Sequence, residues 1–219
     1  MPNLPMNFSI KKAHDMQLCL SEKIIRKDLA KKIQTVGGVD ISYFGDISIG
    51  VVTVFNFRNL ELLETQVVVH PLRMPYLPTL LSFREIPPAV MAIQQLKLQP
   101  NVFLVDAQGL AHPYRCGFAS HLGLILGKPT IGVAKSRLIG QPTKVNGRML
   151  LVHKGEIIGE TVTAKPGIKP VYVSVGHMIS LETAVQVVRH CSKSRIPEPI
   201  LQAHNLATKT RLELAEKTK

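Results

Sequence analysis

Residues 101–134, NVFLVDAQGLAHPYRCGFASHLGLILGKPTIGVA, decide the fold. Two short apolar runs, NVFLV and PTIGVA, flank a stretch of helical pattern through FASHLGLILG. Short apolar runs joined by a helix are typical of a β-α-β unit, whose strands pair in parallel through a right-handed crossover. The unit predicts a parallel core for the sheet. It also places Asp106, directly behind the first run, at the carboxyl edge where such sheets bind their ligands.

Three further β-rich runs precede this unit. They are VGGVDISY (36–43), ISIGVVTVFNF (47–57) and LELLETQVVVHPL (60–72), parted by the turn-forming pieces FGD and RN. Short connections make antiparallel neighbours, so we expect a three-stranded meander. Together with the parallel strands, the meander predicts an α/β fold in which a mixed β-sheet is flanked by helices.

The remaining segments alternate between helix and strand patterns. We expect helices over 13–29, 87–98, 180–191 and 197–219, a hairpin over 148–164 that turns at Lys154 and Gly155, and a strand over 171–177. No repeat and no long polar linker divides the chain. We therefore expect one domain over residues 1–219.

The charge balance of the chain favours a polyanionic partner. Lys and Arg number 27 against 15 Asp and Glu, which gives a formal charge of +12 and a pI of about 9.8. Such a basic chain is typical of nucleic-acid binders. The alternative is that the excess charge serves only solubility.

The cysteines and the apolar runs bear on the compartment. Cys19, Cys116 and Cys191 are widely spaced and form no CxxC pair, so neither a disulfide framework nor a zinc site is indicated. The opening MPNLPMNFSIKK lacks a charged leader followed by an apolar stretch, and no segment approaches the ~20 apolar residues of a membrane helix. We expect a soluble cytoplasmic monomer with no membrane partner.

Two aspartates are candidates for metal binding. Asp40 lies inside the apolar run VGGVDISY, where a charge is costly to bury without a positive partner. If its strand neighbours the one that ends at Asp106, the two carboxylates converge and require a cation, for which Mg²⁺ or Mn²⁺ is suited. The alternatives are that Asp40 pairs with a lysine or with hydroxyl groups, and that Asp106 is a cap facing water.

Glu85 has two competing interpretations. Ser82-x-x-Glu85 fits a capping box, but that helix would carry Pro87 near its start, where the ring removes a hydrogen bond at a cost of ~3 kcal/mol. We therefore expect the helix to begin at Pro87 or Pro88. Glu85 then stands just outside the helix, free to reach a metal ion.

His204 and Lys135 complete the candidate chemistry. His204 shares a helical face with Ile200 and Ala203, so it is either a core histidine or a ligand or general base. Lys135 follows PTIGVA as Asp106 follows NVFLV, and it could hold a phosphate beside the carboxylates. Its alternative is an ordinary surface lysine.

Five motifs carry a resemblance to a known family. VGGVDISY, MPYLPTLLSFRE, VDAQGLAHP, GKPTIGVAKSRL and RIPEP with its following AH resemble, in order, the endonuclease V family of the ribonuclease H-like superfamily. The resemblance runs from about Gly37 to His204. It implies a Mg²⁺-dependent endonuclease that recognises hypoxanthine in DNA and hydrolyses the second phosphodiester bond on its 3′ side. The products carry a 3′-hydroxyl and a 5′-phosphate, and the base is not excised.

The resemblance assigns roles to the five polar candidates. Asp40, Glu85 and Asp106 match the family's metal-binding carboxylates, and His204 matches a position near the metal. Lys135 matches the family lysine that steadies the phosphate. The implied cofactor is Mg²⁺, with Mn²⁺ as a substitute.

The resemblance also places the nucleic acid. Tyr76, between Pro75 and Pro78 in PYLP, matches an aromatic wedge that fills the space left by a displaced base. Without the resemblance, a tyrosine packed on the core would be the commoner reading of such a turn.

Residues in and around the motif VDAQGLAHP are expected to surround the displaced base. The small residues Ala107 and Gly109 leave room for the base, Leu81 and Phe118 form apolar walls, and His112 matches a family histidine near the nucleic acid. The chain departs from the family pattern at Ala107 and Thr79, where glycine is usual or common, and at Tyr114, where arginine is common.

Three alternatives stay open. One is an endonuclease for inosine in single-stranded RNA, which a contact to the 2′-hydroxyl would decide. Another is a non-catalytic nucleic-acid-binding module, although all three carboxylates are present. The last is that the basic charge serves a protein or membrane partner, although no basic amphipathic helix stands out.

Overall fold

The computed structural model describes residues 4, 8–29 and 32–217. The strands are β1 (Thr35–Phe44), β2 (Ile47–Asn56), β3 (Leu62–Pro71), β4 (Val102–Val105), β5 (Thr130–Ala134), β6 (Gln141–Val145), β7 (Arg148–His153), β8 (Glu156–Val162) and β9 (Val171–His177). The helices are α1 (Ile10–Ser21), α2 (Leu81–Gln94), α3 (Phe118–Leu126), α4 (Leu181–Cys191) and α5 (Glu198–Lys217). Part of the opening segment (1–3 and 5–7) and the last two residues of the predicted closing helix lie outside the described residues.

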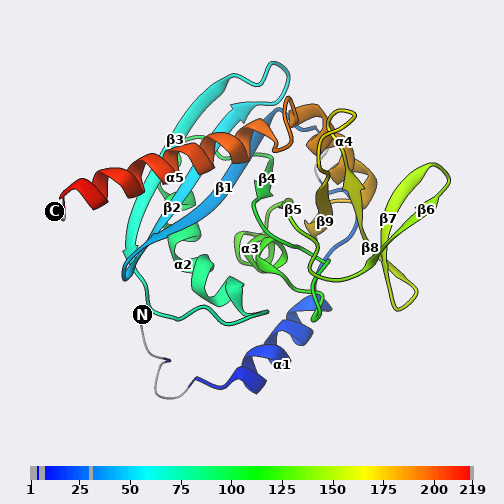
Figure 1. The fold of residues 1–219 in the computed structure, drawn as a ribbon, viewed down its shortest axis with the longest axis horizontal. Helices are drawn as coiled ribbons and strands as arrows, with labels where there is room; N and C mark the ends of the chain where they lie inside the picture. The colour runs from blue at the N-terminus through cyan, green and yellow to red at the C-terminus, as the bar shows by residue number, and fades with distance from the viewer. Residues whose placement is uncertain (1–3, 5–7, 30–31, 218–219) are drawn as a thin grey trace.

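All of these strands belong to one mixed sheet in the order β3-β2-β1-β4-β5-β9-β8-β7-β6 (Figure 1). The predicted meander is confirmed, because β1 and β3 each pair antiparallel with β2. The parallel core is also confirmed, since β4 pairs in parallel with β1 on one side and with β5 on the other. The chain therefore has the mixed α/β fold that the sequence predicts.

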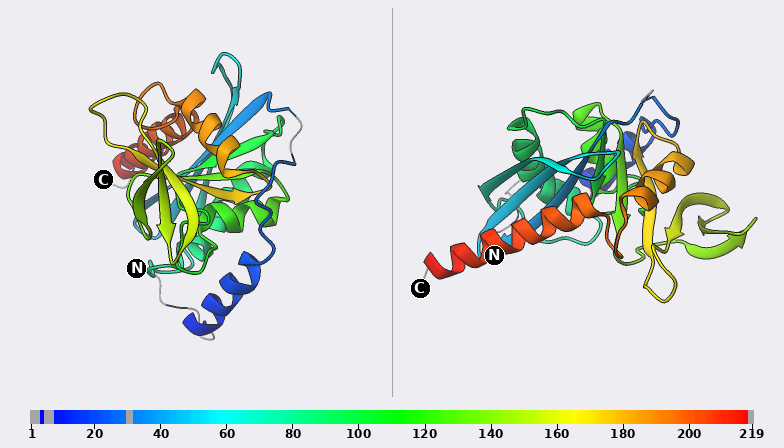
Figure 2. Two further views of the ribbon diagram at one scale, coloured as in Figure 1. Left: turned by 90° about the vertical axis from the view of Figure 1, so that its right-hand side faces the viewer. Right: turned by 90° about the horizontal axis from the view of Figure 1, so that it is seen from above.

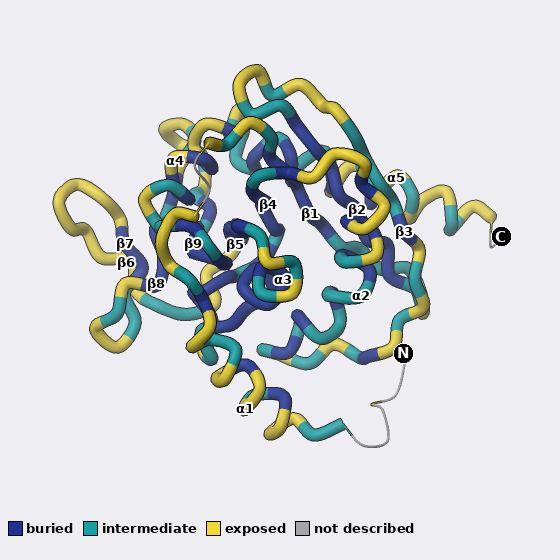
Figure 3. The backbone as a smooth tube through the Cα atoms, turned by 180° about the vertical axis from the view of Figure 1, so that it is seen from behind, coloured by how far each residue is buried: buried dark blue, intermediate teal, exposed yellow. Residues whose placement is uncertain are grey.

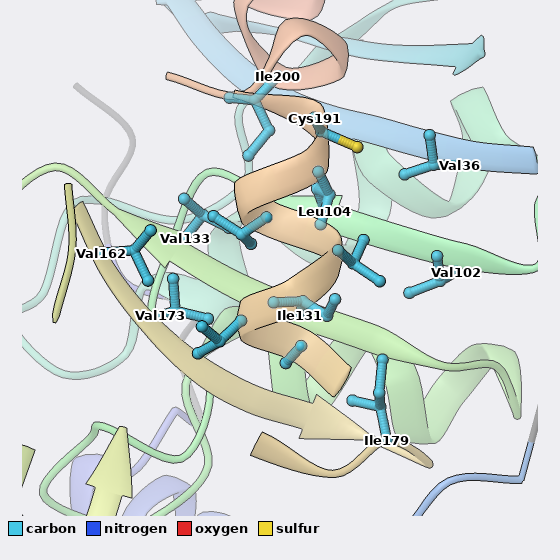
Figure 4. Close-up of a cluster of buried hydrophobic side chains, with 14 of the residues drawn as sticks. Val36, Val102, Leu104, Ile131, Val133, Val162, Val173, Ile179, Cys191 and Ile200 are labelled. Atoms are coloured by element: carbon cyan, nitrogen blue, oxygen red, sulfur yellow. The ribbon is translucent and has the colours of Figure 1, made fainter. Parts of the chain in front are cut away.

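Helices cover both faces of the sheet (Figure 2). On one face, Leu104 and Ile131 pack with the apolar side of α4 and with Ile200 of α5, in the cluster drawn in Figure 4. On the other face, Phe103 and Val105 pack with α2 and α3. Successive residues of β4 thus point to opposite layers, as in any strand buried on both sides. No described helix is both long enough and apolar enough to cross a membrane.

Helix α1 is shorter than predicted. It begins after Ser9, whose hydroxyl accepts a hydrogen bond from the Lys12 amide, and it ends at Ser21 instead of 29. The following segment is held by β9 and the residue after it: the Ile25 amide donates to Nδ1 of His177, and the Leu29 amide donates to the Met178 carbonyl. These tertiary hydrogen bonds replace the helix over the second half of the predicted range.

Strand β6 was not predicted. All five of its residues are exposed, so it has no alternation of apolar and polar positions for a strand pattern to detect. The signal was the turn dipeptide Asn146-Gly147, which joins β6 to β7. The burial-coloured trace shows this hairpin projecting from the body of the protein (Figure 3). The predicted turn at Lys154 and Gly155 is confirmed.

The prediction that α2 begins at Pro87 or Pro88 is wrong. The helix begins at Leu81 and contains both prolines. Its buried residues form one continuous stripe through them: Ser82, Glu85, Pro88, Ala89, Ala92 and Ile93. Packing of that stripe on the sheet offsets the hydrogen bonds that the prolines remove.

Candidate active site

A glycine in β1 brings α5 against the sheet. A Cβ atom on Gly38 would lie 2.1 Å from the Pro199 carbonyl oxygen, so only glycine allows this approach, and Thr53 Oγ1 donates to the same oxygen at 2.8 Å. The helix then carries His204 to the sheet edge, where Nδ1 lies 2.9 Å from Asp40 Oδ2. The His204 side chain is 49% exposed, so it is not a core histidine.

The two aspartates converge because β1 and β4 are neighbours. Asp40 lies within β1 and is buried, and Asp106 follows β4 directly, with its amide donating to the Val39 carbonyl at 3.0 Å. Burial and the charge of Asp106 together raise the pKa of Asp40 to about 6, against the opposing effects of His204 and Lys135. This pair of carboxylates favours a cation.

Lys135 extends from the end of β5 to the same place. Its Nζ lies 2.5 Å from Asp106 Oδ2, so it is a paired lysine at the site. Arg195 donates hydrogen bonds to the carbonyls of Lys135 and Pro170, which fixes the backbone at the end of the strand.

Glu85 reaches the site from inside α2, and the prediction that it stands outside the helix is wrong. The capping box is also not formed, because Ser82 Oγ is hydrogen-bonded to His121 Nδ1 at 3.1 Å. Glu85 Oε1 instead accepts a hydrogen bond from the Tyr43 hydroxyl at 2.8 Å. The Arg84 guanidinium lies 3.9 Å from the centre of the Tyr43 ring.

Burial dominates the electrostatics of Glu85. Burial, helped by the charges of Asp40 and Asp106 and opposed by the Tyr43 hydrogen bond and Arg84, raises the pKa of Glu85 to about 8. Burial also raises the pKa of Tyr43, so its hydroxyl stays protonated and remains a donor. The carboxyl of Glu85 is thus held ready to ionise when a cation enters.

The arrangement of these groups fits a metal ion. Asp40, Asp106 and His204 each offer one ligand atom, and the three atoms lie within 4.8 Å of one another. Two carboxylate oxygens and one imidazole nitrogen are a ligand set for a divalent metal cation, and such an ion would relieve the repulsion between the aspartates. Glu85 lies outside this group of three, on the adjoining wall.

A cavity of about 470 Å³ opens beside these groups. That volume is within the range of about 300–1,000 Å³ typical of small-ligand sites. From the predicted site, the lining includes Asp40, Glu85, Asp106, Lys135, His204, Tyr76, Leu81, His112 and Phe118. Gly109 and Pro78 are not among its lining residues. Gly109 faces β9, where a Cβ atom would lie 2.2 Å from the Val175 carbonyl oxygen, so its predicted place beside the base is wrong, whereas Ala107, predicted with it, does line the cavity together with Gly117.

The loop that carries Tyr76 is anchored to α1. Tyr76 is 61% exposed at the mouth of the cavity, and three residues later Thr79 has a φ of 68°, in the left-handed region. Thr79 Oγ1 is hydrogen-bonded to His14 Nε2 at 2.9 Å, and the His14 ring stacks on Tyr114 with 4.1 Å between centroids. The two departures from the family pattern at Thr79 and Tyr114 therefore meet at one histidine.

His112 is buried in the same wall. Burial lowers its pKa to about 4, so the ring is neutral near pH 7. Its Nδ1 accepts a hydrogen bond from the Tyr114 amide at 3.3 Å, which places the proton on Nε2. The single Nε2–H of the neutral ring donates to the Thr79 carbonyl, so His112 ties this wall to the loop that carries Tyr76.

Sequence reasoning missed three residues around the cavity: His14, Gln17 and Tyr43. Gln17 is fully buried and lines the cavity from α1. The available signal was its spacing of four from the buried Ala13, which puts a polar amide on the apolar face of the helix.

Comparisons with known proteins agree with this geometry. The family model for Endonuclease V matches residues 19–205. Endonuclease V of Dictyoglomus turgidum is 45% identical over 190 residues, which cover 84% of this chain and 83% of the relative. Endonuclease V of Thermofilum pendens is 41% identical over 209 residues, which cover 94% and 90% of the two chains.

Solved structures share the whole fold. The crystal structure of Endonuclease V from Streptomyces avermitilis has a TM-score of 0.85 and 31% identity, covering 99% of this chain and 98% of its own. Human ENDOV has a TM-score of 0.86 and 29% identity, covering 94% and 100%. A variant of Endonuclease V from Ciona intestinalis, in complex with a 23-mer DNA containing an inosine followed by a ribo-adenosine, has a TM-score of 0.85 and 33% identity, covering 94% and 98%.

Proposed function

This chain belongs to the endonuclease V family, and we propose that it recognises deoxyinosine in DNA and hydrolyses the second phosphodiester bond on the 3′ side of the lesion. The reaction leaves a 3′-hydroxyl and a 5′-phosphate. The observation that carries the proposal is the convergence of Asp40, Asp106 and His204 in the wall of a cavity whose mouth holds the exposed ring of Tyr76.

Asp40 and Asp106, with Glu85 and His204, are the residues that would hold Mg²⁺. The ion supplies a lowered pKa for water and neutralises charge that develops on the phosphate. The four side chains come from β1, α2, α5 and the end of β4, so the packed fold fixes them before substrate arrives. Tyr43 holds the Glu85 carboxyl in place through its hydrogen bond.

Lys135 is the residue that would meet the phosphate. Its ammonium group pairs with Asp106 at the cavity wall, and the side chain is 39% exposed. If Asp106 held a cation, its pairing with Lys135 would weaken, and Nζ of Lys135 would be free to contact a phosphate oxygen. A fixed positive charge beside the reacting phosphate stabilises the transition state.

The remaining lining residues suit a displaced purine. Leu81 and Phe118 give apolar walls, and His112 lines the same cavity. Tyr76 stands at the mouth, where its ring can take the place of the displaced base in the stack. Pro75 and Pro78 stiffen its loop, which is anchored further at Thr79.

A second candidate is cleavage of RNA that contains inosine. The Ciona intestinalis structures hold an inosine followed by a ribo-adenosine, so in those relatives a 2′-hydroxyl stands next to the lesion in the bound strand. The metal-binding groups serve either substrate.

End-labelled oligonucleotides test the proposal. Duplex DNA with one deoxyinosine, an undamaged control and the matching inosine RNA are incubated with protein and Mg²⁺, with EDTA, and with the Asp106→Asn variant. The exposed Asp15 on α1, changed to Asn, is the matched control for loss of a carboxylate.

We expect a nick one nucleotide beyond the inosine, abolished by EDTA and by Asp106→Asn and retained by Asp15→Asn. Binding without any nick would overturn the proposal in favour of a non-catalytic module. Cleavage of RNA alone would replace it with the second candidate.

A further inference from the structure

Gln17 has an amide whose orientation is fixed by its surroundings. The side chain is fully buried, and Nε2 donates to the carbonyl oxygens of Thr79 at 2.9 Å and of Cys116 at 3.2 Å. Because both partners are acceptors, the NH₂ group must face them and Oε1 must lie on the other side of the amide. The donor half of the side chain is therefore used within the protein.

The acceptor half has no protein partner. Among the residues that the structure describes, Gln17 Oε1 is one of four buried side-chain polar atoms without a hydrogen bond, together with Gln108 Oε1, Arg84 Nε and Arg195 Nε. Burying an acceptor without a donor costs free energy, so such an atom in a native protein calls for an explanation. Gln17 lines the cavity, and a bound ligand is the direct explanation.

Gln17 lies in the part of the cavity expected to hold the displaced base, and not in the part expected to hold the phosphate. Its two carbonyl partners belong to the loop that carries Tyr76 and to the turn that leads into Phe118, which are the two walls expected around a displaced base. The amide of Gln108 bonds instead to the carbonyl of Ser136, next to Lys135 on the metal side of the cavity.

The ligand must bring a hydrogen-bond donor to this acceptor. Hypoxanthine is a 6-oxopurine and carries a hydrogen on N1, whereas N1 of adenine carries only a lone pair. We propose that Gln17 Oε1 accepts the N1–H of the displaced 6-oxopurine and so distinguishes it from adenine. This inference rests on the proposed function and adds a specificity-determining side chain to it.

The selectivity for hypoxanthine over adenine rests both on the hydrogen bond that hypoxanthine makes with Oε1 and on the repulsion that adenine would meet there. Oε1 facing N1 of adenine would bring two lone pairs together in a buried site. A site built to bond a substrate N–H rejects analogues that lack it, because its own polar group then stays unpaired. Leaving the buried Oε1 opposite a base that has no donor, which costs more than the loss of a solvated hydrogen bond, predicts a change of roughly 10- to 100-fold in cleavage rate.

The test compares two bases that differ at N1. Duplex DNA contains either deoxyinosine or the deoxynucleoside of 6-methoxypurine, which keeps an oxygen at C6 but has no hydrogen on N1. Single-turnover cleavage of each is measured with the wild-type protein, with Gln17→Met, and with Gln186→Met, an exposed glutamine on α4 as the matched control. Thermal unfolding of each variant verifies that it folds.

We expect wild-type protein and Gln186→Met to cut the inosine DNA about 10- to 100-fold faster than the 6-methoxypurine DNA. Gln17→Met should slow the inosine reaction more than the 6-methoxypurine reaction, because loss of the Nε2 hydrogen bonds affects both substrates whereas loss of Oε1 affects only inosine, so that the preference collapses. Equal slowing of both substrates would overturn the inference and leave Gln17 as a structural clamp between the two walls. Equal rates with the wild-type protein would overturn it without reference to any variant.

The outcomes also separate the inference from the function on which it rests. A wild-type protein that cuts no inosine DNA would refute the proposed function. A wild-type protein that cuts inosine DNA with a preference that Gln17→Met leaves unchanged would refute only the role of Gln17.

Discussion

Replacing Tyr43 by phenylalanine should weaken metal binding without touching any proposed ligand atom. The Tyr43 hydroxyl donates to Glu85 Oε1 at 2.8 Å, and Glu85 is buried beside Asp40 and Asp106. The pKa of Glu85 is raised to about 8, so near neutral pH its carboxyl is largely protonated and must lose that proton when a cation binds. Tyr43 stabilises the ionised carboxyl more than the neutral one.

The size of the effect follows from that difference. A hydrogen bond contributes about 0.5–1.5 kcal/mol when both partners are neutral and about 1.5–3 kcal/mol when one is charged. The differential contribution is therefore ~1–1.5 kcal/mol, which corresponds to a roughly 5- to 13-fold loss of cation affinity at pH 7. The loss should narrow as the pH rises above the Glu85 pKa of about 8, because the carboxyl is then ionised before the metal arrives.

Calorimetric titration with Mn²⁺ at pH 7 and at higher pH measures this loss directly, and the Mg²⁺ dependence of cleavage provides a second reading. Tyr172→Phe on β9 is the matched control, since it removes the same hydroxyl at a position that does not line the cavity. Unchanged affinity in Tyr43→Phe, or a loss that is equal at all pH values, would show that Glu85 is not coupled to the cation as argued.

Three other changes probe separate parts of the site. Lys135→Ala should keep or strengthen Mn²⁺ binding, because Asp106 loses its partner, while cleavage falls about 10²–10³-fold; weaker Mn²⁺ binding would contradict this. Gly50→Ala places a Cβ atom 2.4 Å from the Pro88 carbonyl oxygen and should lower the free energy of unfolding by ~1–3 kcal/mol in urea titrations, with cleavage reduced as α2 shifts. His112 has a pKa lowered from 6.5 to about 4, so the unfolded chain binds more protons between these values and stability falls on acidification. Urea titrations at pH 7 and pH 5 should show about 2 kcal/mol of pH dependence that His112→Gln lacks.

The sheet could be predicted because its signals are local. Apolar runs with short connections predicted the antiparallel meander. The apolar run that ends before Asp106 predicted the strand of the parallel core. The convergence of Asp40 and Asp106 was predicted only on the condition that their strands are neighbours, and the pairing of β1 with β4 meets that condition. By contrast, β6 was missed because none of its residues is buried, so the strand lacks the apolar pattern from which strands are predicted.

The placement of Glu85 could not be predicted by local rules, which gave the wrong answer. Two consecutive prolines argue for a helix start, and only the contacts of α2 with the sheet and α3 make a helix through them stable. Gln17 is a similar case, because its partners Thr79 and Cys116 lie 62 and 99 residues away in the chain. The burial of a glutamine on an apolar helix face is visible in the pattern, but its purpose appears only when the cavity is closed by distant segments.

This chain was expected to depart from the family pattern at Thr79 and at Tyr114, and the two side chains belong to a single cluster around His14. A threonine at a φ of 68° costs roughly 1–2 kcal/mol relative to glycine, which adopts this region freely. His14 offsets that cost, because its Nε2 bonds to Thr79 Oγ1 and its ring stacks on Tyr114. A glycine at 79 would lack the hydroxyl that holds His14, and a residue without a flat ring at 114 would lack the surface on which His14 lies. The three side chains therefore tie α1 to the loop of Tyr76, and they support the same helix that presents Gln17 to the cavity.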